Sequence, residues 1–170
     1  MKALAIGILM WMQANCNAPG VHPEHNYCNL NWNQSVPEIV VLPQRQLVRE
    51  FRKNRGQVPG GYDTIRGFYV HEGNERFTIY MLDQDYSEIL HQADLLHELS
   101  HYIQDRNGVI MDCPPHYEVP VYLMQLHFYR KKTGGDATSE MIDVYKRNTC
   151  NTLYLGEFKD GTWSIVHGTF

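Results

Sequence analysis

Two histidines and a glutamate in the middle of the chain stand at a spacing that suits a metal ion. His97 and His101 are four residues apart, and Glu98 directly follows the first of them. On a helix, side chains four residues apart project from the same face, so both imidazoles can bind one zinc ion. Bound zinc lowers the pKa of water to about 7, and a neighbouring carboxylate can then take up a proton. The pattern predicts a hydrolytic zinc site with Glu98 as general base; the alternative is two ordinary histidines at helical spacing.

A catalytic zinc ion usually has three protein ligands and one open position, so a third ligand must come from elsewhere in the chain. The positions three and six residues after the second histidine hold Gln104 and Asn107, which excludes the metzincin motif. Glu118 stands near the start of the next helical pattern, which can return along the first helix. We predict Glu118 as the third ligand, with His116 and Asp112 as alternatives.

Two further side chains are candidates for supporting roles. Tyr122 follows Glu118 by one helical turn, so it can orient a ligand or donate a hydrogen bond to a developing oxyanion. Asp94 precedes His97 by one turn and can act beside the ligands. We predict Tyr122 as a catalytic residue; the alternative is a tyrosine packed in the core.

The hydrophobic pattern predicts the elements that would position these residues. Residues 86–107 carry apolar side chains on two sides of a predicted helix, which indicates a central position in the domain. Asp85 is expected to cap this helix and Gly108 to end it. The other expected elements are helices at 44–54, 117–132 and 136–147, a strand hairpin at 65–71 and 76–82, and a second hairpin at 153–158 and 163–166. The fold class predicted is α+β, with a small antiparallel sheet, an active-site helix and a returning helix that carries the third ligand.

The motif at 97–101, taken together with Glu118, resembles the gluzincin group of zincin metallopeptidases. Over about residues 62–125 the chain is also similar to a small uncharacterised bacterial zincin-like family, and the segments that carry this similarity are 67–69, 79–81, 95–104 and 118–125. The resemblance implies a minimal zincin-like domain, Zn²⁺ bound by the two histidines and Glu118, and Glu98 as general base. It further implies that the strand before the active helix, expected at 76–82, forms a rim where an extended peptide pairs.

The N-terminus has the pattern of an export signal. Lys2 is followed by an apolar run to Met12, which is shorter than the roughly 20 apolar residues that span a bilayer. We therefore predict a signal peptide at 1–14, an irregular arm at 15–42 and a single zincin-like domain at 43–170. The protein would be secreted or periplasmic, with no stable membrane insertion after signal removal. The alternative is a buried N-terminal strand or helix of a cytosolic protein.

Export would place the four cysteines in an oxidising compartment, where two disulfides are expected. Four cysteines allow three pairings. The simplest of them joins Cys16 to Cys28 and Cys113 to Cys150.

The charge of the chain limits the partners that it can bind. The formal net charge of -4 and the pI near 6.1 provide no broad basic surface for nucleic acid. We predict a zinc metallopeptidase acting on a peptide or protein substrate, and nothing in the sequence indicates an oligomeric state. One alternative is a zinc hydrolase for another amide, such as that of a cell-wall peptide. The other is a secreted binding or interaction module whose metal is structural or absent.

Overall fold

The computed structural model describes residues 1–17, 27–56, 65–71, 76–110, 114–135, 153–159 and 162–168, and for 114–116 and the last two ranges it describes the backbone alone. The predicted helix at 136–147, the predicted Cys113–Cys150 disulfide and the alternative ligand Asp112 lie outside the described residues. The side chain of the other alternative ligand, His116, also lies outside them.

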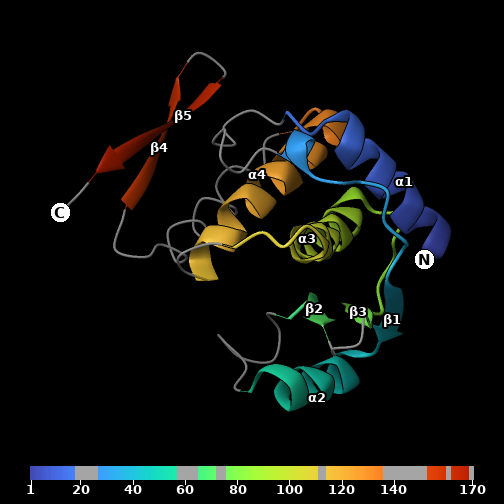
Figure 1. Ribbon diagram of the computed structural model, residues 1–170. Helices are drawn as coiled ribbons and strands as arrows, with labels where there is room; N and C mark the ends of the chain where they lie inside the picture. The colour runs from blue at the N-terminus through green and yellow to red at the C-terminus, as the bar shows by residue number, and fades with distance from the viewer. Residues whose placement is uncertain are drawn as a thin grey trace.

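The described elements alternate between helices and short strands (Figure 1). In chain order they are α1 (Lys2–Ala14), the short 3-10 helix η2 (Tyr27–Asn29), β1 (Glu38–Leu42), α2 (Gln44–Arg55), β2 (Gly67–His71), β3 (Phe77–Leu82), α3 (Ile89–Arg106), α4 (Pro114–Thr133), β4 (Leu153–Lys159) and β5 (Thr162–Gly168). The predicted α+β class is confirmed, and both predicted hairpins, β2 with β3 and β4 with β5, are antiparallel pairs.

The main sheet has three strands in the order β1-β3-β2, and it is mixed. β1 runs parallel to β3, with Glu38 beside Thr78 at one end of the pair and Leu42 beside Leu82 at the other. The sequence analysis was wrong here, because it assigned 38–42 to an irregular arm and expected a purely antiparallel sheet. These residues form a strand because their apolar side chains can pair with β3, which is distant in the sequence.

The order of the strands also corrects the prediction about the substrate rim. β3, expected at 76–82 to pair with an extended peptide, lies in the centre of the sheet. Its backbone bonds are taken by β1 on one side and β2 on the other, so no edge is left for a third partner. Among the strands of this sheet, β1 and β2 are the edges.

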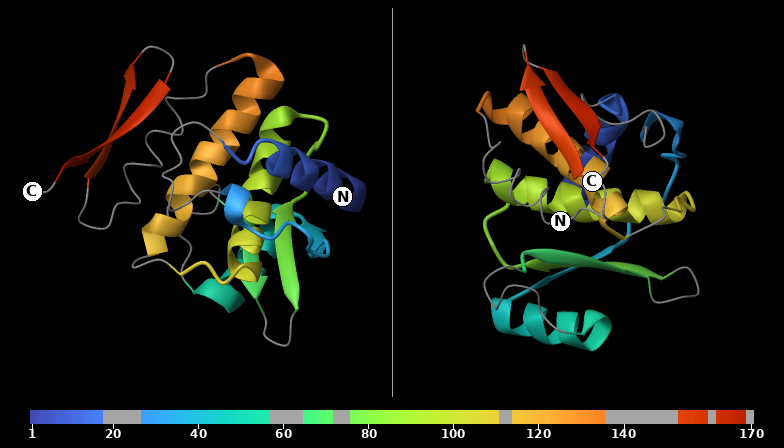
Figure 2. Two further views of the ribbon diagram at one scale, coloured as in Figure 1. Left: turned by 45° about the horizontal axis from the view of Figure 1, so that its top comes forward. Right: turned by 90° about the vertical axis from the view of Figure 1, so that its left-hand side faces the viewer.

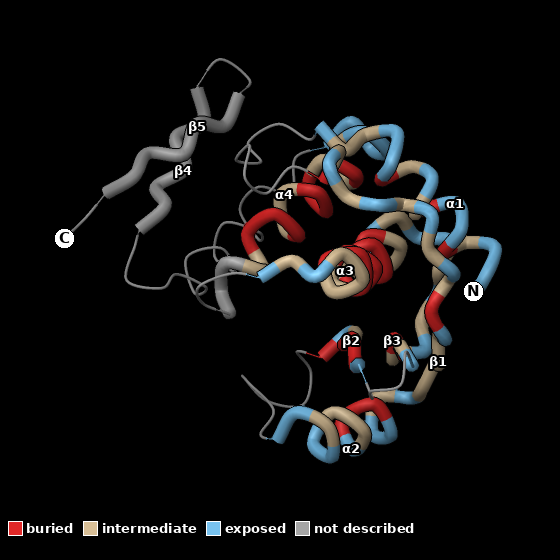
Figure 3. Tube along the Cα trace, in the orientation of Figure 1, coloured by how far each residue is buried: buried red, intermediate tan, exposed pale blue. Residues whose placement is uncertain are grey.

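Helices cover both faces of the sheet, with α2 on one face and α3 on the other (Figure 2). Side chains of β2 alternate between these layers: Phe68 and Val70 pack with Leu47 and Val48 of α2, whereas Tyr69 belongs to the core beneath α3. α4 and α1 pack on the side of α3 that faces away from the sheet (Figure 1). α3 is therefore buried on several sides, as the red tube in Figure 3 shows, and its predicted central position is confirmed.

The ends of α3 differ in part from the prediction. The helix begins at Ile89 instead of 86, because Asp85 accepts a 2.9 Å hydrogen bond from the backbone N–H of Ser87 and so forms a separate turn before the helix. The predicted stop is confirmed, since Gly108 adopts a φ of 61°, a left-handed conformation that glycine tolerates best. The N–H of Val109 then bonds to the carbonyl of Gln104 at 3.0 Å.

α4 begins at Pro114, three residues before the predicted start. This places Glu118 inside the helix, one turn from its first residue, with Pro120 two residues further on. Proline lacks a backbone N–H and removes one helical hydrogen bond, yet the helix continues through it.

Residues 2–14, which the sequence analysis set apart from the fold as an export signal, form α1. Ala5, Ile8 and Met12 lie on one side of this helix and are buried in the main core, and the Trp11 ring meets the Phe128 ring of α4 edge-on at 4.8 Å between centroids. In the described part of the chain, no helix combines the length and the apolar character that crossing a membrane requires.

The predicted disulfide between Cys16 and Cys28 is present, with the two Cα atoms 4.8 Å apart. It joins the residues that follow α1 to η2. The chain after η2 is held against the end of α3, where the side-chain oxygen of Asn107 accepts a hydrogen bond from the N–H of Asn31 at 2.6 Å. The described residues that follow η2 therefore pack against the end of α3.

Candidate metal centre

The predicted ligands from α3 and α4 meet where these helices lie side by side. His97 Nε2 is 3.2 Å from one carboxylate oxygen of Glu118, and His101 Nε2 is 3.4 Å from the other. The two Nε2 atoms are themselves 3.2 Å apart. Among the described residues, these three make up the one group of three or more potential ligands whose donor atoms lie close together, all within 4.8 Å of one another.

The spacing of these groups suits a zinc ion. Tetrahedral zinc bound about 2.05 Å from each ligand atom separates neighbouring ligand atoms by about 3.3–3.4 Å. The two Nε2 atoms are 3.2 Å apart, close to this value, and each lies 3.2 or 3.4 Å from a different carboxylate oxygen of Glu118, so the three groups converge on one point. In addition, the buried oxygen Oε2 of Glu118 receives no well-aligned hydrogen bond. A buried acceptor normally has a partner, and a cation would supply one here.

The pKa shifts of His97 and Glu118 also suit a bound cation. Burial lowers the pKa of His97, but hydrogen bonding to Glu118 and the charges of Glu98 and Glu118 outweigh it, so the pKa is raised overall. Burial raises the pKa of Glu118, but hydrogen bonds and charge from both histidines outweigh it and hold the pKa well below its usual range. Together the groups therefore favour positive charge between them, which a divalent cation provides.

The other ring nitrogen of each histidine faces a glutamine. His97 Nδ1 is 3.2 Å from the amide oxygen of Gln125 in α4, and His101 Nδ1 is 3.1 Å from the amide oxygen of Gln104 in α3. No role at the site was predicted for either glutamine: Gln104 counted as a departure from the metzincin motif, and both lie in segments that carry the family resemblance. The spacing of three residues between His101 and Gln104 was a usable signal, because such residues are neighbours on a helix.

Glu98 lies on the side of α3 that faces the sheet, and its side chain is buried. Its Cγ approaches β2 so closely that a Cβ placed on Gly67 would lie 3.1 Å from it. Burial is the main reason that the pKa of Glu98 is raised; the carboxylates of Glu118 and Asp94 add to this effect, while the two histidines oppose it. A carboxylate with a raised pKa is suited to accept and return a proton near neutral pH.

Tyr122 also lies at this centre, as predicted. Its ring is 4.6 Å from the ring of His97, centroid to centroid, with the planes tilted by 57°. Burial raises the pKa of the Tyr122 hydroxyl, and the nearby carboxylates of Glu118 and Glu98 raise it further. The hydroxyl is therefore protonated at neutral pH and can donate a hydrogen bond.

Asp94 has partners of its own outside the ligand group. Its carboxylate is 3.4 Å from the side-chain nitrogen of Gln84 and 3.9 Å from the guanidinium of Arg66. Burial raises its pKa, against the opposing charge of Arg66. Asp94 thus lies beside the centre and contributes negative charge without joining the ligands.

One further residue near the centre was not predicted. Tyr27 of η2 is fully buried; burial raises the pKa of its hydroxyl, Ser100 of α3 lowers it, and the charge of Glu118 raises it further. The hydroxyl lies within electrostatic reach of Glu118, although the two residues are far apart in the sequence. No sequence signal pointed to this residue, because its segment lacks periodicity.

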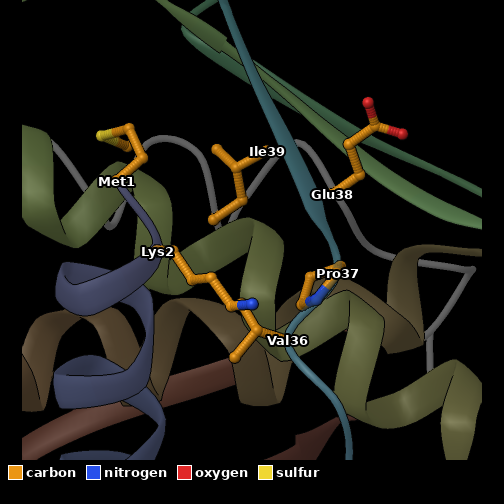
Figure 4. A pocket seen from close by; sticks show the side chains of 6 residues that line it. All are labelled: Met1, Lys2, Val36, Pro37, Glu38 and Ile39. Atoms are coloured by element: carbon orange, nitrogen blue, oxygen red, sulfur yellow. The ribbon is translucent and has the colours of Figure 1, made fainter.

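A separate hollow of about 350 Å³ lies elsewhere, between the start of α1 and the segment that leads into β1 (Figure 4). Six residues line it, and they are Met1, Lys2, Val36, Pro37, Glu38 and Ile39. None of them belongs to the His97 group, so this hollow does not form part of the candidate centre.

The candidate centre is thus built by two helices, with a sheet edge and a tyrosine beside it. α3 contributes two imidazoles and a buried carboxylate, and α4 contributes a second carboxylate. Comparisons of the chain with protein-family models, with curated proteins and with solved structures gave no match.

Proposed function

We propose that the protein is a zinc-dependent hydrolase, and more narrowly a metallopeptidase of the gluzincin type. His97, His101 and Glu118 would hold the zinc ion. The observation that carries this proposal is the convergence of two imidazoles and a carboxylate whose donor atoms lie within 4.8 Å of one another, with the two Nε2 atoms 3.2 Å apart and the buried oxygen Oε2 of Glu118 lacking a well-aligned hydrogen bond.

When bound, zinc would lower the pKa of water and polarise the carbonyl oxygen of the substrate. Glu98 would accept the proton from the attacking water and return it to the leaving nitrogen of the amide. Its burial and raised pKa support this double role, since the carboxylate can hold a proton between the two steps.

Tyr122 would donate a hydrogen bond to the oxyanion that forms when water attacks the carbonyl. Its ring lies against His97, and its hydroxyl keeps its proton at neutral pH because burial and nearby carboxylates raise its pKa. A donor that is already in place costs no reorganisation as the charge develops.

An extended peptide would bind along β2 instead of the central strand. The N–H of Leu82 bonds to the carbonyl of Arg66, and because bonded pairs alternate along antiparallel strands, the backbone groups of Gly67 and Tyr69 point away from β3. Gly67 lies beside Glu98, so pairing there would bring a peptide to the metal. At Tyr69 the carbonyl already accepts a 2.7 Å hydrogen bond from Arg55, which limits this edge to a short stretch.

We further propose that the protein is exported to a secreted or periplasmic location. The apolar run at 2–12 follows the pattern of a signal peptide, and the Cys16–Cys28 disulfide is compatible with an oxidising compartment.

The metal and the reaction can be tested separately. Purified protein should contain close to one zinc per chain; His101→Ala should lose it, whereas the control His91→Ala, on the same helix, should keep it.

Glu98→Gln should keep zinc and lose hydrolysis of a mixed peptide library, while Glu88→Gln, which removes an exposed carboxylate at the start of α3, should change neither. Zinc-loaded protein that cleaves no peptide would favour a binding module with a structural metal. Full activity in Glu98→Gln would rule out the proposed base.

A further inference from the structure

In each of the two histidines of the centre, the ring nitrogen that faces away from Glu118, Nδ1, contacts the side chain of a glutamine. The orientation of one amide is determined by its own second bond: Gln104 Nε2 is 3.0 Å from the backbone carbonyl of Tyr117. A carbonyl only accepts, so the amide nitrogen must face it. The amide oxygen of Gln104 must then face His101 Nδ1, at 3.1 Å.

This contact determines which nitrogen of His101 carries the proton. An amide oxygen also only accepts, so Nδ1 must be the N–H donor, and the lone pair of the neutral ring is left on Nε2. Nε2 is the atom that lies 3.4 Å from Glu118. His97 repeats the arrangement, with Nδ1 3.2 Å from the amide oxygen of Gln125 and Nε2 3.2 Å from Glu118.

Both glutamines are set into the core instead of the surface. Gln104 is 3% exposed and Gln125 is 6% exposed. Three carboxylates, those of Glu98, Glu118 and Asp94, already raise the negative charge of this region. An amide accepts the Nδ1–H bond without adding a further buried charge, whose desolvation would be costly. The uncharged acceptor therefore suits this environment better than a carboxylate would.

We propose that Gln104 and Gln125 are positioning residues that hold both imidazoles in the Nδ1–H form, with the two Nε2 lone pairs aimed at one point before a divalent cation arrives. This inference rests on the metal-binding part of the proposed function, and it does not depend on the reaction. Such outer partners orient ligands, and their loss typically weakens metal affinity by about 10–100-fold.

The first test measures zinc affinity of the full-length protein by competition with a chromophoric chelator. Gln104→Leu and Gln125→Leu should each bind zinc about 10–100-fold more weakly than the unaltered protein. The matched control is Gln92→Leu, which removes a glutamine of the same helix α3 whose amide bonds to the carbonyl of Tyr86 and to neither histidine. Its zinc affinity should stay within about twofold of the unaltered protein. Equal affinities in all four proteins would overturn the proposal.

The second test reads the tautomers directly, by ¹⁵N NMR of the metal-free protein at a pH where both rings are neutral. The unaltered protein should show Nδ1–H for His97 and His101. Gln125→Leu should release His97 from this form and leave His101 unchanged, whereas a general loosening of the fold would affect both rings. Gln125→Glu, which keeps an acceptor, should restore Nδ1–H at His97. Retention of Nδ1–H at His97 in Gln125→Leu would overturn the proposal.

Gln104→Leu is more at risk of misfolding than Gln125→Leu. Gln104→Leu also removes the bond to Tyr117, so if it fails to fold, Gln125→Leu decides both tests. A protein that binds zinc as expected and hydrolyses nothing would refute the proposed function and leave this inference standing. Normal hydrolysis with unchanged affinities and tautomers in the leucine variants would refute the inference alone.

Discussion

Gly67→Ala is the substitution that most directly tests how the sheet positions the general base. A methyl group at this position would lie 2.7 Å from the sulfur of Met81 and 3.1 Å from Cγ of Glu98. Carbon atoms in ordinary contact are about 3.5–4.0 Å apart, so the Met81 sulfur must move by about 1 Å and Cγ of Glu98 by a few tenths of an ångström. Met81 is fully buried, and extra volume in a packed core costs about 1–3 kcal/mol of folding free energy.

The same displacement should lower the rate of catalysis as well as the stability of the fold. A misplacement of about 1 Å in a catalytic group can reduce the rate about 10²-fold, whereas the metal ligands are not touched by the new methyl group. Because Glu98 moves by only part of that distance, we expect Gly67→Ala to retain zinc, to lose about 1–3 kcal/mol in urea unfolding, and to hydrolyse peptides about 10-fold more slowly.

A matched control separates the two effects. Val70 lies on the same strand but packs toward α2, on the opposite face of the sheet from Glu98. Val70→Ala should lose a similar 1–3 kcal/mol, roughly, through the cavity it leaves, and keep its turnover. If Gly67→Ala and Val70→Ala retained equal turnover while Glu98→Gln lost it, the close approach of Gly67 would have no part in positioning the base.

Three other predictions follow from the centre and its surroundings. Removing zinc with a chelator should lower the unfolding free energy by about 2.7 kcal/mol relative to protein with free zinc at 100 times its Kd; calorimetry measures this, and an unchanged melting temperature would argue against a bound metal. Tyr122→Phe should keep zinc and lower kcat by about 10²–10³-fold, and unchanged kcat would make Tyr122 a packing residue only. Replacing Cys16 and Cys28 by serine should cost about 2–4 kcal/mol in urea unfolding, because the disulfide closes a loop over a sequence separation of 12; equal midpoints would show that η2 is held without it.

The grouping of His97, His101 and Glu118 could be predicted from the sequence because its geometry is mostly local. The distance between His97 and His101 follows from the pitch of a single helix, and the apolar pattern around them indicates that the helix is buried. The prediction that Glu118 joins them needed one more assumption, that the next helix returns along the first. The short connection between α3 and α4 makes that return the simplest arrangement, and the structure has it.

The strand order was not accessible in the same way. β1 pairs with a strand about 40 residues later, in parallel, and this pairing leaves no trace in the periodicity of 38–42. Without β1, β3 looked like the rim of the sheet; with it, β3 is central and β2 becomes the edge beside Glu98. An apolar run such as 2–12 is equally ambiguous, because an export signal and a helix packed in a core have the same composition.

The two glutamines show how these local and distant effects combine at one centre. Gln104 shares a helix with His101, so its approach to the ring follows from their spacing of three residues alone. Gln125 lies on α4 and reaches His97 only because the same packing that delivers Glu118 also brings the next turns of α4 against α3. A single contact between two helices therefore supplies both the proposed third ligand and the glutamine proposed to orient His97, so a change in how α4 packs should alter metal affinity even where no proposed ligand is replaced.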